Sequence, residues 1–129
     1  MNRQLLMWVL AVIVAVGAIG LYAKKSQTPA APGALDQFAE CLKEKKAVFY
    51  GAFWCSHCQD QKKLFGDSAR FLPYVECSTP DGTGQRPECV AKKVTGYPTW
   101  EFADGTRESG ELALAHLAEK TGCALPAAK

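Results

Sequence analysis

Two cysteines separated by two residues, Cys55 and Cys58, are the side chains of this sequence with the clearest chemical use. An apolar and aromatic run that starts at Ala47 precedes them, and a polar, helix-compatible segment follows them. Two cysteines three positions apart at the start of a helix lie within bridging distance, with the first exposed and the second tucked behind it. The pattern therefore predicts a redox-active dithiol at a helix N-terminus.

The surroundings of Cys55 predict its reactivity. The unpaired N–H groups and partial positive charge of a helix N-terminus stabilise a thiolate, the form that attacks disulfides. His57 strengthens this effect if it is protonated or donates a hydrogen bond to the sulfur. We expect Ser56, His57 and the preceding Trp54 to tune the site, and a histidine between the cysteines indicates an oxidising bias.

Three other uses of paired cysteines compete with this one. A zinc site would need a second close pair, but Cys77 and Cys89 are widely spaced. Covalent haem attachment needs a histidine directly after the second cysteine, where this chain has Gln59. An inert structural disulfide stays open, although a short-loop bridge at a helix start is typically labile. We expect no metal and no cofactor.

The N-terminal segment, residues 1–25, is predicted to be a membrane anchor. Residues 5–23 are all apolar, glycine or aromatic, and basic residues flank them, so the run is long enough to span a bilayer. A cleaved signal peptide is the alternative, because Ala30, Ala31 and Ala34 offer small residues for cleavage. The run exceeds the usual apolar region of a signal peptide, however, and those alanines sit beside prolines. Residues 26–33 carry two prolines and read as a linker.

Composition places the rest of the chain in an oxidising compartment. The sequence has 129 residues, 48% of them hydrophobic, which allows one compact domain besides the anchor. Six cysteines in so short a chain favour the periplasm or an equivalent lumen, so we expect a single-pass membrane protein with its C-terminal domain there. A net charge of +2 gives no sign of nucleic-acid binding.

Residues 34–129 are predicted to form one α/β domain. In chain order the patterns indicate a helix over 35–46, a strand from 47, a helix from the cysteines to about 71, a strand over 73–77, a glycine-rich loop over 78–86, a helix from 87 that carries Cys89 and Val94, strands over 99–103 and 106–109, and a helix over 111–120. A crossover helix joins the first two strands and a hairpin the last two, which predicts a mixed sheet with helices on both faces. Because the first two strands run parallel, we expect Cys55 and Cys77 at the same edge.

The other four cysteines allow three pairings. Cys77 and Cys89 bracket the glycine-rich loop and are the best candidates for a second disulfide. Cys41 and Cys123, near the ends of the first and last helices, would then pair and pin the C-terminus. We expect the Cys77–Cys89 bridge to be structural, with a relay of electrons to or from the first pair as the alternative.

Three longer motifs, YGAFWCSHCQDQKKLFG, LPYVEC and GYPTWEF, extend the pattern. With the order of elements they resemble the thioredoxin superfamily. More narrowly, they resemble the thioredoxin-like domain that accompanies vitamin K epoxide reductase homologues in bacteria and plastids, over roughly residues 36–125. The resemblance implies a thioredoxin-like fold and a membrane quinone reductase as partner, which exchanges disulfides with this domain and so drives disulfide formation in exported proteins.

The resemblance also assigns a site around Pro98. This residue matches the cis-proline of the family, which sits against the cysteine motif and presents backbone to a bound substrate strand; we place Tyr97 in the same substrate groove. Phe49 is a departure, because thioredoxin itself has there a buried aspartate that assists proton removal from the second thiol. The group that deprotonates Cys58 is left open, with Glu101 and water as candidates.

The sequence thus predicts a membrane-anchored thiol–disulfide oxidoreductase. An incoming thiolate attacks the disulfide, forms a mixed disulfide through Cys55, and Cys58 or a second partner thiol resolves it. The expected partners are the membrane, a vitamin K epoxide reductase-like membrane protein and exported cysteine-containing proteins. Two alternatives stay open: a tethered reductant of specific exported disulfides, as in cytochrome c maturation, and a non-catalytic module that binds extended polypeptide or scaffolds a membrane complex.

Overall fold

The computed structural model describes residues 2–4, 7–8 and 33–127 of the chain. The chain divides into two units, Met1–Ala31 and Pro32–Lys129, and all the elements described below belong to the second unit. Nearly all of the predicted anchor and linker lies outside the described residues. Among the helices that can be described, none is both long and apolar enough to cross a membrane.

The elements of the second unit follow the order predicted from the sequence. They are α2 (Asp36–Glu44), β1 (Val48–Gly51), α3 (Ser56–Phe65), the 3-10 helix η1 (Gly66–Phe71), β2 (Tyr74–Glu76), α4 (Pro87–Ala91), β3 (Thr99–Glu101), β4 (Arg107–Ser109) and α5 (Leu114–Thr121).

The strands form one mixed sheet in the order β2-β1-β3-β4. β1 pairs in parallel with β2 and antiparallel with β3, and β3 pairs antiparallel with β4. The register sets Gly51 opposite Glu76, and the backbone N–H of Cys77 donates to the carbonyl of Gly51 at 2.8 Å. The ends of β1 and β2 therefore meet at one edge, as predicted, and a four-stranded mixed sheet with helices fits a thioredoxin-like fold.

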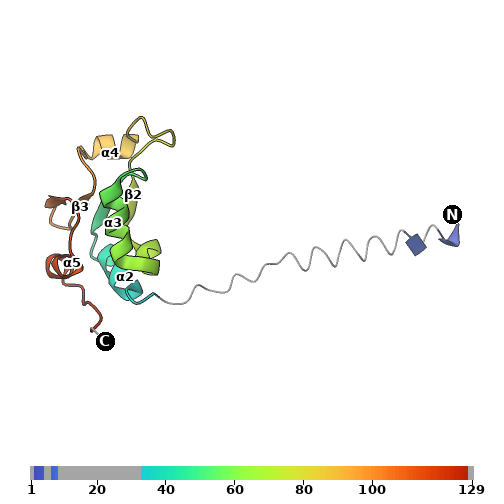
Figure 1. Ribbon diagram of the computed structural model, residues 1–129, viewed down its shortest axis with the longest axis horizontal. Coiled ribbons are helices and arrows are strands. Elements are labelled where there is room, and N and C mark those ends of the chain that lie inside the picture. Colours follow the sequence, from blue (N-terminus) through green and yellow to red (C-terminus); the bar gives the residue numbers. More distant parts are fainter. Residues whose placement is uncertain (1, 5–6, 9–32, 128–129) are drawn as a thin grey trace. The chain divides into compact units, whose positions relative to one another are not determined.

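Side chains that alternate along β1 divide the interior into two cores. Phe49 faces the larger core, which α2, α3 and α5 cover, and it stacks on Trp100 with ring centroids 4.9 Å apart. Tyr50 faces a smaller core on the other side, with Cys89 of α4 and Val94. Figure 1 shows α4 and the loop before it at one end of this unit, and α2 with the C-terminal segment at the other.

α3 and α5 have different bounds from those predicted. α3 ends at Phe65, before the expected end near residue 71, because Gly66 takes a left-handed φ of 52° and the chain continues as η1. α5 begins at Leu114 and not at Glu111, because Leu112 uses both its backbone N–H and its carbonyl in hydrogen bonds to the side chain of Gln61. These side-chain bonds replace those of a first helical turn.

α4 is also shorter than predicted. It ends at Ala91, so that Val94 lies beyond it, although Val94 is buried in the smaller core. Pro87 occupies the first turn of this helix, as its fixed φ favours.

Candidate active site

Cys55 and Cys58 lie at the N-terminus of α3, where the sequence placed them. Cys55 is the N-cap residue in extended conformation, and its Sγ accepts a hydrogen bond from the backbone N–H of Cys58 at 3.2 Å. Both are free thiols. This places Cys55 Sγ where a helix N-terminus favours an anion.

Cys55 is less exposed than the sequence predicted. It is 7% exposed against 1% for Cys58, because it belongs to the larger core and Tyr97 packs against that core. The neighbouring Trp54 meets the ring of Tyr97 edge to face, with centroids 5.9 Å apart. Little of Cys55 is therefore open to solvent, and aromatic side chains pack close to it.

Burial raises the pKa of Cys58 from 9.0 to about 12, and its hydrogen bond to Cys55 acts in the same direction. The positive charge of Lys62 opposes this rise in pKa. At neutral pH Cys58 is therefore a thiol, and it needs a proton acceptor whenever it has to act as a nucleophile.

His57 contacts a residue that the sequence did not single out. Its Nδ1 lies 2.6 Å from Oε1 of Glu111, and its side chain is 70% exposed. Glu111 follows β4 and is 54 residues away in the chain, so no local pattern could have indicated the pair. Ser56, also predicted to tune the site, is exposed at the first position of α3.

A group of potential metal ligands surrounds this pair. His57, Asp60 and Glu111 place ligand atoms within 4.8 Å of one another. All three side chains already have partners within the protein. Glu111 pairs with His57, and Asp60 pairs with Lys63 at 2.6 Å. Exposed acidic groups gathered in this way are common on protein surfaces without a metal ion.

Pro98 follows a cis peptide bond, as the resemblance implied, and it is fully buried. Its carbonyl accepts a hydrogen bond from the backbone N–H of Gly110 at 2.9 Å. No hydrogen bond joins the backbone N–H or carbonyl of Tyr97 to another described residue. The hydroxyl of Tyr97 accepts a hydrogen bond from the side-chain amide of Gln85 at 2.7 Å.

An aromatic rim, made of Phe53, Trp54 and Tyr97, borders the cysteines. Phe53 is 48% exposed and Trp54 is 54% exposed. The indole N–H of Trp54 donates to Oγ of Ser78 at 2.9 Å, and a Cβ added at Gly82 would lie 3.6 Å from both aromatic rings. The glycine-rich loop therefore supports the rim at both Phe53 and Trp54.

Tyr74 of β2 lies close to Cys58 across Gly51, and Glu76 of the same strand is its hydrogen-bond partner; the sequence analysis selected neither. The Tyr74 hydroxyl donates to Oε2 of Glu76 at 2.7 Å. Alternation along the motif LPYVEC, in a strand parallel to β1, was the signal that could have placed both on the face of Phe49. Glu101 cannot serve Cys58, because it faces the other core and its carboxylate is bound by Arg107 at 2.6 Å.

The remaining cysteines form the two disulfides expected from their spacing. Cys77 is bonded to Cys89 and Cys41 to Cys123, with Cα atoms 5.6 Å and 5.9 Å apart. Cys77 and Cys89 are both 0% exposed, which leaves an incoming thiolate no access to either sulfur.

The comparisons with known proteins point to the chemistry that the cysteine motif predicts. The chain is 47% identical over 92 residues to the thiol-disulfide oxidoreductase LTO1 of Arabidopsis thaliana. This region covers 67% of the chain but 24% of the relative, so the chain spans about a quarter of that protein's length. No protein-family model matches. The similarity is thus to an oxidoreductase of thiols and disulfides.

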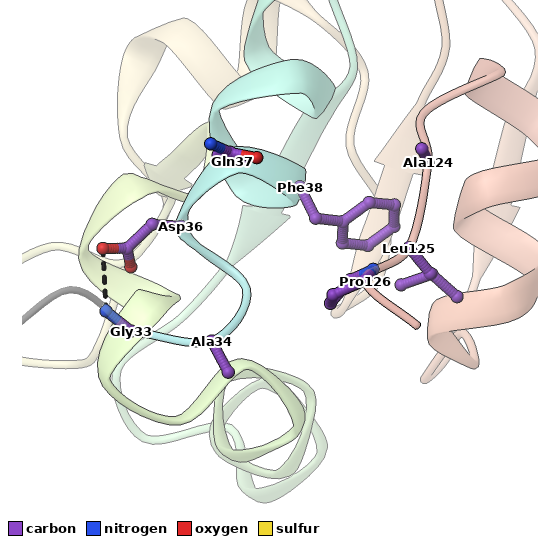
Figure 2. Close-up of a pocket in the computed structure, with 8 residues that line it drawn as sticks. All are labelled: Gly33, Ala34, Asp36, Gln37, Phe38, Ala124, Leu125 and Pro126. Carbon is purple, nitrogen blue, oxygen red and sulfur yellow. Dashed lines mark hydrogen bonds between the residues drawn. The ribbon is translucent and has the colours of Figure 1, made fainter. Parts of the chain in front are cut away.

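A separate cavity of about 280 Å³ lies away from the cysteine motif. Figure 2 shows it between the start of α2 and the C-terminal residues 124–126, with the rings of Phe38 and Pro126 and the side chain of Leu125 close together. At the margin of the cavity, the backbone N–H of Gly33 donates a hydrogen bond to the carboxylate of Asp36. Neither Cys55 nor Cys58 lines this cavity, so it takes no part in the redox site.

Proposed function

We propose that this protein is a membrane-anchored thiol–disulfide oxidoreductase with Cys55 and Cys58 as its redox centre. The observation that carries the proposal is the pair of free thiols at the N-terminus of α3, with the Sγ of one accepting the N–H of the other. The similarity to a thiol-disulfide oxidoreductase supports the same reaction.

In the oxidising direction the enzyme starts with a Cys55–Cys58 disulfide. A substrate thiolate attacks Cys55 Sγ, a mixed disulfide forms, and Cys58 leaves with the electron pair of the broken S–S bond. A second substrate thiol then attacks the mixed disulfide, which releases oxidised substrate and the enzyme dithiol. Attack falls on Cys55 because Cys58 lies deeper, at 1% exposure.

An extended substrate segment suits the opening. The backbone N–H and carbonyl of Tyr97 are free for a passing strand among the residues described, and the aromatic rim offers apolar contact beside Cys55. A partner that reoxidises the dithiol completes the cycle. We infer a vitamin K epoxide reductase-like membrane protein in that role, supported by the three motifs and by the apolar run of residues 5–23.

Trapping tests the partner and the placement of the domain. In the full chain with Cys58→Ser, mixed disulfides through Cys55 should accumulate with a membrane quinone reductase and with exported cysteine-containing proteins. The matched control is Cys55→Ser, which should trap neither. The proposal fails if the Cys58→Ser chain accumulates no mixed disulfide with any membrane or exported protein.

Reduction potential tests the direction of electron flow. The protein is equilibrated with thiol–disulfide buffers, alkylated, and each cysteine is identified by mass spectrometry. A potential for Cys55–Cys58 of about −120 to −200 mV supports an oxidant, and one near −270 mV or below supports the tethered reductant.

A further inference from the structure

The deeper cysteine needs a proton acceptor that the cysteine motif does not contain. We propose that Tyr74 and Glu76 form a proton relay for Cys58, with Tyr74 exchanging the proton and Glu76 receiving it through Tyr74. The inference rests on the proposed function. Phe49, at the position where the resemblance to thioredoxin would place a buried acid, is 0% exposed and cannot take a proton.

The end of β1 brings the relay and the thiol together. A Cβ added at Gly51 would lie 3.1 Å from Sγ of Cys58 and 3.3 Å from the hydroxyl oxygen of Tyr74. Both atoms therefore border the same small space above the Gly51 Cα. Gly51 has no side chain that could stand between the Cys58 thiol and the Tyr74 hydroxyl.

Glu76 is held in a fixed position beyond the phenol. Its Oε2 accepts from the Tyr74 hydroxyl at 2.7 Å, and its Oε1 accepts from the backbone N–H groups of Ser78 at 2.8 Å and Phe53 at 3.2 Å. The Tyr74 hydroxyl is the donor in its bond to Oε2, so its proton points toward Glu76. The lone pairs of the Tyr74 oxygen are then left to accept a proton.

Two other titratable groups face this space. Lys62 Nζ lies 3.4 Å from the centroid of the Tyr74 ring, and its charge favours the thiolate of Cys58. Cys55, on the same helix as Lys62, is hydrogen-bonded to Cys58. Lys62 thus stabilises the product of proton removal, while the relay supplies the acceptor.

The step balances for a mixed disulfide at Cys55. Cys58 gives its proton to the Tyr74 oxygen as Tyr74 gives its own to Oε2 of Glu76. The Cys58 sulfur then bonds to Cys55 Sγ, and the bond between Cys55 and the partner sulfur breaks with its electron pair on the partner. Cys58 is oxidised and the partner sulfur is reduced to a thiolate. The reverse sequence returns the proton when Cys58 is the leaving group.

A two-phase reaction isolates this step. The full chain, with the Cys55–Cys58 pair reduced, is mixed with the aromatic disulfide dithiobis(nitrobenzoate). Attack by Cys55 releases one coloured thionitrobenzoate, and attack by Cys58 on the mixed disulfide releases the second. We expect Tyr74→Phe and Glu76→Gln to slow the second phase at least about tenfold at neutral pH and to leave the first phase unchanged.

The pH profile separates a relay from a structural effect. In both variants the rate of the second phase should rise about tenfold per pH unit, because hydroxide replaces the relay, whereas the unmodified protein should show a flatter profile. Tyr50→Phe and Glu101→Gln, on the other face of the sheet, are the matched controls and should behave as the unmodified protein.

The outcomes are distinguishable. The relay is overturned if Glu76→Gln leaves the rate of the second phase and its pH profile unchanged. If circular dichroism shows that Tyr74→Phe does not fold, the result for Glu76→Gln alone decides whether the relay exists. An unmodified protein whose thiols give neither phase contradicts the proposed function instead.

Discussion

At the scale of single residues, two cysteines three positions apart have different surroundings. Cys55 caps a helix and meets the aromatic rim, whereas Cys58 is enclosed by β1, β2 and the rest of α3. Enclosure disfavours the charged form of Cys58, and this links its ionisation to the stability of the reduced protein.

The free energy of unfolding of the reduced protein should fall as pH rises from about 9 to 12. The pKa of Cys58 is raised by burial to about 12 in the folded state from 9.0, so between these values the unfolded chain has released a proton that the folded chain retains. Stability is then lost with a slope of at most about 1.4 kcal/mol per pH unit for this one proton. Denaturant titrations across this range measure it.

The control for this prediction is Cys58→Ala, which should lack the added slope. Tyr74, whose pKa burial also raises, contributes in the same direction in both proteins, and only the smaller part of its rise that comes from the charge of Cys58 is lost in Cys58→Ala. Equal slopes in the two reduced proteins would contradict the prediction.

Residue types and spacing were enough to place Cys55 and Cys58 at the start of a helix that follows a buried strand. They could not show that His57 turns to Glu111, because that contact depends on how the segment after β4 packs against α3. The same is true of Tyr74 and Glu76, whose relation to Cys58 arises only from the pairing of two strands.

At the scale of elements, the end of β1 leaves room for no side chain at Gly51. A Cβ there would lie 2.7 Å from Tyr74 Cε2 and 3.1 Å from Cys58 Sγ. Gly51→Ala should therefore cost about 1–3 kcal/mol of unfolding free energy and slow the reaction of Cys58. Gly96→Ala, where nothing lies within 4 Å, is the control and should change stability by less than about 1 kcal/mol. Similar losses in both variants would argue against crowding at the end of β1.

The loop closed by Cys77 and Cys89 gives a second prediction at this scale. Both sulfurs are buried, so this bridge should persist in buffers that reduce Cys55–Cys58, as alkylation and mass spectrometry can measure. The double variant Cys77→Ser, Cys89→Ser should lose about 3 kcal/mol by the chain-entropy model. Reduction of both pairs over one range of potential would instead make the bridge part of an electron relay.

The order of elements could be predicted because alternation and helical periodicity are local properties of the chain. The ends of the helices could not, since they depend on distant partners. The side chain of Gln61 takes the backbone groups of Leu112, and α5 starts two residues later for that reason. Gly66 is a residue type that often ends helices, but the helical pattern on both sides of it led to a predicted end of α3 near residue 71.

At the scale of the whole domain, the Cys41–Cys123 bridge joins α2 to the residue after the C-cap of α5. It spans a sequence separation of 82. Its removal in Cys41→Ser, Cys123→Ser should therefore lower the free energy of unfolding by about 4 kcal/mol, more than removal of the shorter bridge. Equilibrium denaturation of the two double variants measures both losses, and the opposite order would contradict the loop-length argument.

The same bridge has a mechanical consequence. α2 and the C-terminal segment lie at one end of the domain, and the bond between Cys41 and Cys123 spans them (Figure 1). If a pulling force is applied to the N-terminal and C-terminal residues of the domain, the Cys41–Cys123 bond carries that force from one chain end to the other. The sheet and α3 lie within the closed loop and bear almost none of the load. In a pulling experiment the oxidised domain should extend only at its short terminal segments, and the sheet should unravel only after this bond is reduced.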